Sequence, residues 1–156
     1  MNNKVVLNGL MLIIFSVFLV GCTSLPTGNN VGAVANDQPL SEEDYVKIPI
    51  SSIPYDMQKF SLDANGIGVN YFVVLGSDGQ IRTAFDACDV CGGHKGYSQR
   101  GFDVVCDNCG RVFKIDDVGS MNAPGGCWPS FLDHQIQEGN VWINKAEIAR
   151  GAFRFA

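Results

Sequence analysis

The stretch Cys88-Asp89-Val90-Cys91-Gly92 returns almost unchanged as Cys106-Asp107-Asn108-Cys109-Gly110. In each copy the two cysteines lie three positions apart, so both thiols can turn inward around one centre. The glycine after the second cysteine lets the backbone fold tightly and direct N–H groups at the sulfurs. Two C-x2-C pairs in series are close to the pattern of a zinc site, whose central spacer is slightly longer. The repeat therefore predicts a four-sulfur site.

The segment before the first cysteine pair predicts a buried β-meander. Residues 68–75 carry apolar side chains on both faces, which is typical of a central strand. Asn65-Gly66 before this strand and Asp78-Gly79 after it favour hairpin turns. Residues 80–85 then return as a strand that leads to Cys88, so we expect the first cysteine pair at a strand end.

Four further segments predict short strands, and they are residues 46–50, 102–105, 111–115 and 140–143. The first is expected at a sheet edge, because Pro49 has no N–H to donate to a neighbouring strand. The second and third flank Cys106 and Cys109, and such a hairpin is the usual setting of a metal knuckle.

A short helix is expected near the C-terminus. Asn144 is a typical N-cap with Glu147 at the third position, and Gly151 would end the helix. Phe153 and Phe155 are expected to pack back on the sheet. The predicted fold is thus mainly β, a small β-meander or sandwich-like domain with cysteine knuckles and one short helix.

Residues 1–22 have the pattern of a lipoprotein signal peptide. Lys4 precedes an apolar run over residues 5–20, which is just short of the roughly 20 residues that span a bilayer. The run ends Leu19-Val20-Gly21-Cys22, which resembles a bacterial or archaeal lipobox and predicts a lipid on the sulfur of Cys22. An uncleaved N-terminal membrane helix is the alternative.

The rest of the chain divides into a tether and a body. Residues 23–43 are rich in Gly, Ala, Asn and Asp and predict a flexible spacer. Residues 44–156 form the folded domain. We therefore expect a domain attached by lipid to the cell membrane and facing outside the cytoplasm.

Charge and composition exclude some classes of function. The net charge is −5 and the pI about 4.8, so a nucleic-acid partner is not expected, because binding phosphates needs a basic face. No nucleophile–base pair or carboxylate dyad stands out, and we do not predict an enzyme.

The two cysteine pairs leave several chemistries open. Four thiolates suit zinc, mononuclear iron or an iron–sulfur cluster. Their negative charge would need compensation, and the acidic and basic residues of this segment nearly cancel: Asp86, Asp89, Asp103 and Asp107 against Arg82, Lys95, Arg100, Arg111 and Lys114. Two disulfides are the alternative in an oxidising compartment, but a bridge across so short a loop removes little chain entropy.

Thiol–disulfide exchange and haem attachment fit the motifs less well. A reactive thiol needs a lowered pKa, and the nearby carboxylates of Asp86, Asp89 and Asp107 would raise it. A c-type haem needs a histidine after C-x-x-C, whereas glycine follows both pairs.

Four further residues are candidates near the site. Cys127 follows Gly125-Gly126 on a loop of unusual backbone freedom and is a candidate fifth ligand or a small buried residue. His94 could ligate or cap the site, or be merely exposed. Tyr97 and Phe113 are expected to exclude water from the site or to form ordinary core.

These elements resemble the membrane iron–sulfur FtrD-like domain family over roughly residues 45–156. The resemblance rests on motifs that occur in order: Ala84 to Cys91, Lys95 to Gln99, Val105 to Gly110, Phe113 and Gly125 to Pro129. It implies an iron–sulfur centre, a link to ferrous iron uptake across the membrane, and a ligand set of Cys88, Cys91, Cys106, Cys109 and Cys127. The chain departs from the pattern at Trp128, where we expect a smaller polar residue, and in having no array of membrane helices.

The function expected from the sequence is that of a non-catalytic, lipid-anchored metal protein. An iron–sulfur or iron–thiolate site would serve electron transfer or ferrous iron uptake, with a membrane iron permease or a redox protein as partner. The alternatives are a binding module with a structural zinc ion and a copper-handling protein.

Overall fold

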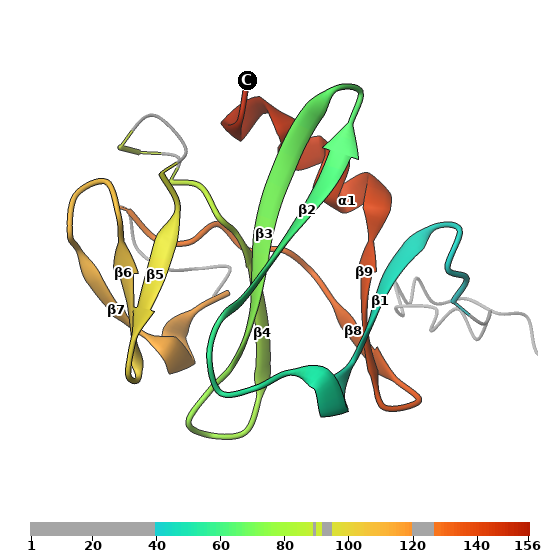
Figure 1. The fold of residues 1–156 in the computed structure, drawn as a ribbon, viewed down its shortest axis with the longest axis horizontal. Helices are drawn as coiled ribbons and strands as arrows, with labels where there is room; N and C mark the ends of the chain where they lie inside the picture. Colours follow the sequence, from blue (N-terminus) through green and yellow to red (C-terminus); the bar gives the residue numbers. More distant parts are fainter. Residues whose placement is uncertain (1–39, 89, 92–94, 120–126) are drawn as a thin grey trace, which may run out of the picture. The chain divides into compact units, whose positions relative to one another are not determined.

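The central strand β3 (Ile67–Leu75) divides the domain into two apolar cores. The computed structural model describes residues 40–88, 90–91, 95–119 and 127–156, and this part of the chain forms three antiparallel sheets, one short α-helix and three 3-10 turns (Figure 1). The mainly β fold expected from the sequence is confirmed. No helix in the described residues is long and apolar enough to span a bilayer.

Each sheet has three strands (Figure 1). Sheet A has the order β1 (Tyr45–Pro49), β9 (Asn140–Asn144) and β8 (Gln135–Gln137); sheet B has β2 (Gln58–Ala64), β3 and β4 (Ile81–Phe85); sheet C has β5 (Tyr97–Arg100), β6 (Asp103–Cys106) and β7 (Val112–Lys114). The predicted edge position of β1 and central position of β3 are confirmed.

Side chains alternate along β3 between the two cores. Val69, Tyr71 and Val73 belong to the helix-side core, and Phe72 and Val74 to the cysteine-side core. The helix-side core consists of Ile48, Ala64, Val69, Tyr71, Val73, Phe85, Leu132, Val141, Ile143 and Ile148. The cysteine-side core consists of Phe72, Val74, Ala84, Cys88, Tyr97, Val104, Cys106, Phe113, Ile115, Val118 and Cys127. Since successive strand residues face opposite ways, one apolar strand serves both cores.

The two predicted hairpins of sheet B are present. Asn65 and Gly66 have φ angles of 58° and 86°, which a two-residue turn between antiparallel strands requires, and Ala64 pairs with Ile67 across it. The second loop is longer than a two-residue turn, because Gly76 donates its N–H to the carbonyl of Gln80.

The C-terminal helix α1 (Lys145–Arg150) begins and ends as expected. The Asn144 side chain accepts hydrogen bonds from the N–H groups of Ala146 and Glu147. Phe155 packs against the helix-side core, but the expectation for Phe153 is wrong. The 3-10 turn η3 (Gly151–Arg154) directs Phe153 outward, where its ring is 69% exposed and lies 4.3 Å from the Arg154 guanidinium.

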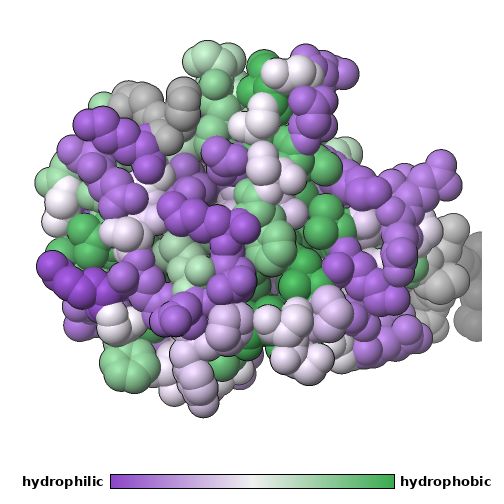
Figure 2. Space-filling model, viewed as in Figure 1, coloured by the Kyte–Doolittle hydropathy of each residue, from purple (hydrophilic) through white to green (hydrophobic). Residues whose placement is uncertain are grey.

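One face of the molecule carries many hydrophilic side chains. Figure 2 shows hydrophilic side chains spread over one face, with apolar side chains visible between them. Large exposed apolar side chains include Val90 beside the first cysteine pair and Val112 after the second.

Candidate metal centre

The cysteines come from three segments of the chain. Cys88 follows the end of β4, and Cys106 is the last residue of β6. Cys109 lies in the turn between β6 and β7. Cys127 lies ahead of Phe131, which forms an isolated β-bridge with Ala84 of β4. This bridge brings the third segment against the strand that carries the first cysteine pair.

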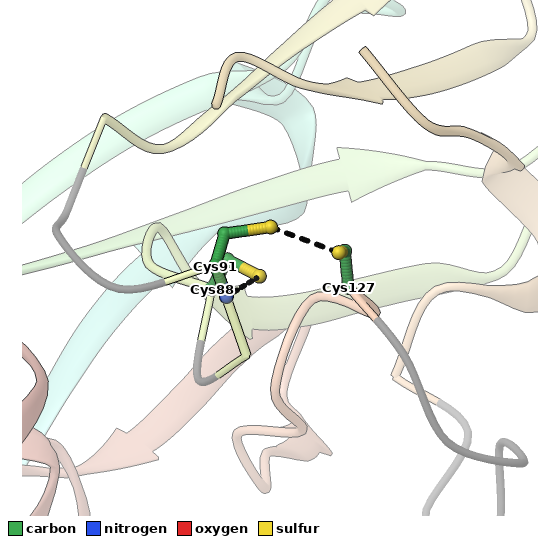
Figure 3. Close-up of side chains that lie close together, drawn as sticks. All are labelled: Cys88, Cys91 and Cys127. Carbon is green, nitrogen blue, oxygen red and sulfur yellow. Dashed lines mark hydrogen bonds between the residues drawn. The ribbon is translucent and has the colours of Figure 1, made fainter. Parts of the chain in front are cut away.

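All five of these cysteines gather at one place. The sulfurs of Cys88, Cys91 and Cys127 lie within 4.8 Å of one another, and so do those of Cys91, Cys106 and Cys109. Cys91 belongs to both groups, and its sulfur faces that of Cys127 at 2.9 Å (Figure 3). None of the five is in a disulfide. The structure thus brings the predicted residues together, while their roles as ligands stay a prediction.

Backbone N–H groups point at the first sulfur of each pair. The Cys91 N–H lies 3.3 Å from the Cys88 sulfur (Figure 3). Burial raises the pKa of Cys88, but hydrogen bonds from the N–H groups of Cys91 and Val90, together with those of the Cys91 and Tyr97 side chains, outweigh it, and the net pKa is lowered. Cys106 receives the matching N–H groups of Cys109 and Asn108, yet burial prevails and its pKa is raised. The sequence repeat therefore corresponds to a repeated hydrogen-bonding pattern.

The exposed thiol of Cys109 has a lowered pKa. The Arg111 N–H and neighbouring thiols lower the pKa of Cys109 to about 7. Hydrogen bonds with the sulfurs of Cys127 and Cys88 instead raise the pKa of Cys91. The thiols therefore differ in their tendency to ionise, although they lie together.

The pKa values of Cys88 and Cys109 are lowered although carboxylates lie nearby in the sequence. The buried Asp86 carboxylate accepts a hydrogen bond from the Tyr97 N–H at 2.7 Å and pairs with the Lys59 ammonium at 2.8 Å. Asp107 accepts a hydrogen bond from the Ser98 hydroxyl. These acidic groups are bonded to partners other than the sulfurs.

Two of the basic residues counted in the charge balance, Lys114 and Arg82, form ion pairs. Lys114 binds Asp103 at 2.7 Å, and Arg82 binds Asp78 at 2.7 Å. Burial and backbone N–H groups, rather than these side chains, are the main causes of the pKa shifts of Cys88 and Cys106.

Aromatic residues form one wall of the site. Tyr97 and Phe113 are buried, with ring centroids 6.4 Å apart. The Tyr97 hydroxyl donates to the Cys127 carbonyl at 2.9 Å. Trp128, where the family resemblance predicts a smaller polar residue, is half-buried and packs on Phe113 with centroids 4.7 Å apart. Tyr97 and Phe113 are therefore core residues that also border the cysteines.

The sequence analysis did not predict the structural roles of three residues that hold the cysteine segments in place. The Asn108 side chain donates to the Cys91 carbonyl at 3.0 Å and so ties the two knuckles together. Asp86 and Gly96 meet closely: a Cβ at Gly96 would lie 2.5 Å from the Asp86 carboxylate, and Gly96 has a φ angle of +84°. The position of Asn108 within the repeat is the one signal that could have indicated its role.

Some predicted residues lie outside the described part of the chain. They are Cys22 with the whole signal segment, most of the tether, Asp89, His94 and the glycines before Cys127. Within the described tether residues, Glu42 and Glu43 offer their carbonyls to the Lys145 ammonium.

Comparison with known proteins identifies the family. Residues 54–155 match the membrane iron-sulfur containing protein FtrD-like family, and the chain belongs to this family. No curated protein matches the sequence.

The similar solved structures include two crystal structures of the quaternary ammonium Rieske monooxygenase CntA. One contains the inhibitor MMV12, and it is 21% identical over 67% of this chain, with a TM-score of 0.46. The other contains L-carnitine, and it is 18% identical over 65% of this chain, with a TM-score of 0.45. This chain spans about a third of their length, 32% in each case. At these TM-scores the likeness carries no conclusion about function.

The residues present fit an iron–sulfur cluster or iron. Five thiol sulfurs converge, and backbone N–H groups already point at two of them. Every buried side-chain nitrogen and oxygen of the described residues has a hydrogen-bond partner. Family and donor set together identify the cofactor as an iron–sulfur cluster or iron.

Proposed function

We propose that the protein is an electron carrier for ferrous iron uptake, held at the outer side of the cell membrane by a lipid on Cys22. The observation that carries the proposal is the convergence of five cysteine sulfurs from three segments in a chain of the FtrD-like family. Iron held by such sulfurs supplies one-electron chemistry.

The burial of the cysteines supports electron transfer. Cys88, Cys106 and Cys127 are buried, whereas Cys109 is exposed. The core therefore excludes water from most of the site, while one sulfur lies at the surface where a redox partner can approach. Burial and hydrogen bonds to sulfur are the protein's means of setting the potential.

A catalytic role is not part of the proposal. Within the described residues, the groups around the cysteines include aromatic rings, the Tyr97 hydroxyl, backbone amides and the Asn108 amide. None of them is a positioned general base beside a nucleophile. The site is suited to hold a metal centre and exchange electrons.

The sequence and the family support the proposed membrane anchor and partner. The lipobox pattern is matched by Leu19-Val20-Gly21-Cys22. The matching family is described as one of membrane proteins. A membrane iron permease is the partner that the link to ferrous iron uptake favours.

The test is anaerobic purification of the full-length protein, followed by iron and acid-labile sulfide analysis and visible spectroscopy. We expect bound iron and a charge-transfer absorption that dithionite bleaches. Cys22→Ser is a matched control, because it should keep the colour and lose the membrane attachment. A colourless protein with one zinc ion, or one with copper, would contradict the proposal.

A further inference from the structure

The sulfurs of Cys91 and Cys127 lie close enough for a small movement to join them. We infer that Cys91 and Cys127 form a reversible disulfide when the site holds no metal. Their sulfurs face each other at 2.9 Å (Figure 3). An S–S bond is about 2.05 Å long, so less than about 1 Å of approach is needed.

Backbone hydrogen bonds hold both residues in place without any metal. The Asn108 side chain donates to the Cys91 carbonyl at 3.0 Å, and the Tyr97 hydroxyl donates to the Cys127 carbonyl at 2.9 Å. Tyr97 is itself fully buried in the cysteine-side core. These hydrogen bonds position the backbone of both cysteines and do not involve the two sulfurs.

Loop length favours this pair over a bond within either C-x2-C pair. Cys91 and Cys127 are 36 positions apart, whereas Cys88 and Cys91 are three apart. Closing a longer loop removes more entropy from the unfolded chain, so the bond between segments stabilises the fold more. The N–H of Cys91 also holds the Cys88 sulfur in a hydrogen bond.

The oxidant is a low-molecular-weight disulfide such as oxidised glutathione. One of the two cysteines, as its thiolate, attacks one glutathione sulfur, and the glutathione S–S bond breaks. The other cysteine then attacks the cysteine sulfur of this mixed disulfide and displaces the second glutathione. The two cysteine thiols lose two electrons and two protons, and the glutathione disulfide gains them and becomes two glutathione thiols.

The bond would close the site to metal. Cys91 belongs to both three-sulfur groups, and so its oxidation removes one member from each. Reduction by a thiol would restore both groups. The inferred disulfide depends on the positions of the Cys91 and Cys127 sulfurs and is independent of which metal the site binds.

The test is disulfide mapping of the full-length protein after iron has been removed with a chelator under reducing conditions. The reduced protein is transferred to oxidised glutathione, its remaining thiols are alkylated, and it is digested with trypsin. Cleavage after Arg82, Lys95, Lys114 and Lys145 places Cys88 and Cys91 in the peptide 83–95 and Cys127 in the peptide 115–145.

We expect these two peptides to be joined, with fragment ions assigning the bond to Cys91, and two thiols to be lost per chain. Bonds within peptide 83–95 or within peptide 101–111, or no loss of thiols, would overturn the inference. The outcome is informative even for a protein that never binds iron, because the mapping uses the metal-free form.

Two variants sharpen the result. Cys127→Ser should abolish the joined peptides, whereas Cys109→Ser, which removes the exposed thiol, should keep them. Tyr97→Phe removes the hydrogen bond to the Cys127 carbonyl and keeps the ring, so we expect the yield of joined peptides at equal glutathione to fall about fivefold. An unchanged yield would contradict the positioning role of the Tyr97 hydroxyl.

Discussion

Asp86 connects the strand before the first cysteine pair to the strand after it. Its carboxylate binds the N–H of Tyr97 and the ammonium of Lys59. Asp86→Ala would leave the Tyr97 N–H buried without a partner, so we expect the free energy of unfolding to fall by about 1–3 kcal/mol in urea titrations. Asp86→Asn keeps an oxygen acceptor and should lose less. An equal loss of unfolding free energy in the two variants would show that Asp86 does not stabilise the fold through its hydrogen bond with the Tyr97 N–H.

His134 makes the stability of the domain depend on pH. Burial lowers the pKa of His134 below its usual 6.5, although the negative charge of Asp133 acts to raise it. The Nδ1 atom of His134 lies 2.9 Å from the Thr83 hydroxyl. The unfolded chain therefore binds a proton more readily than the folded chain. Stability should be fully present above pH 6.5 and should fall as the pH drops from there through the lowered pKa.

The measurement is the melting temperature as a function of pH, with His134→Asn as the control. The asparagine amide can still donate to the Thr83 hydroxyl but does not titrate. We expect a smaller decrease in the melting temperature below pH 6.5 for this variant. An identical pH profile would assign the loss to other groups.

Among the elements, helix α1 depends on its N-cap. The Asn144 side chain accepts from two N–H groups, those of Ala146 and Glu147. Asn144→Ala should therefore destabilise the protein by about 1 kcal/mol in urea titrations, and Asn144→Asp, which can accept the same bonds, should not. Since Ile148 of this helix packs in the helix-side core, the iron absorption should be unchanged in both variants.

Two strands had no adequate signal in the sequence. β5 is short and mostly polar, and its place comes from pairing with β6 and from the bond between Tyr97 and Asp86. β8 is exposed along its length and is ordered by pairing with β9. By contrast, β3 and the Asn65-Gly66 turn were predicted correctly, because apolar runs and turn residues act locally.

At the scale of the whole molecule, the two cores can be tested through adjacent residues of β3. Val73 and Val74 are both fully buried, but Val73 lies in the helix-side core and Val74 in the cysteine-side core. Val73→Ala and Val74→Ala should each lower the free energy of unfolding by about 2 kcal/mol. We expect only Val74→Ala to shift the visible absorption or the reduction potential of the iron-loaded protein. A shift of equal size in Val73→Ala would contradict the division into two cores.

Local sequence patterns were sufficient to predict which cysteines form the site and where most of the strands lie. The cysteine repeat predicted two matching knuckles, and the alternation of apolar residues predicted a central strand, because both depend on residues close in the chain. Only packing between distant segments brought Cys127 to Cys91 and turned the Asp86 carboxylate from the thiols toward Tyr97 and Lys59. Such contacts depend on how the three sheets pack together, and the spacing of residues along the chain does not determine that packing.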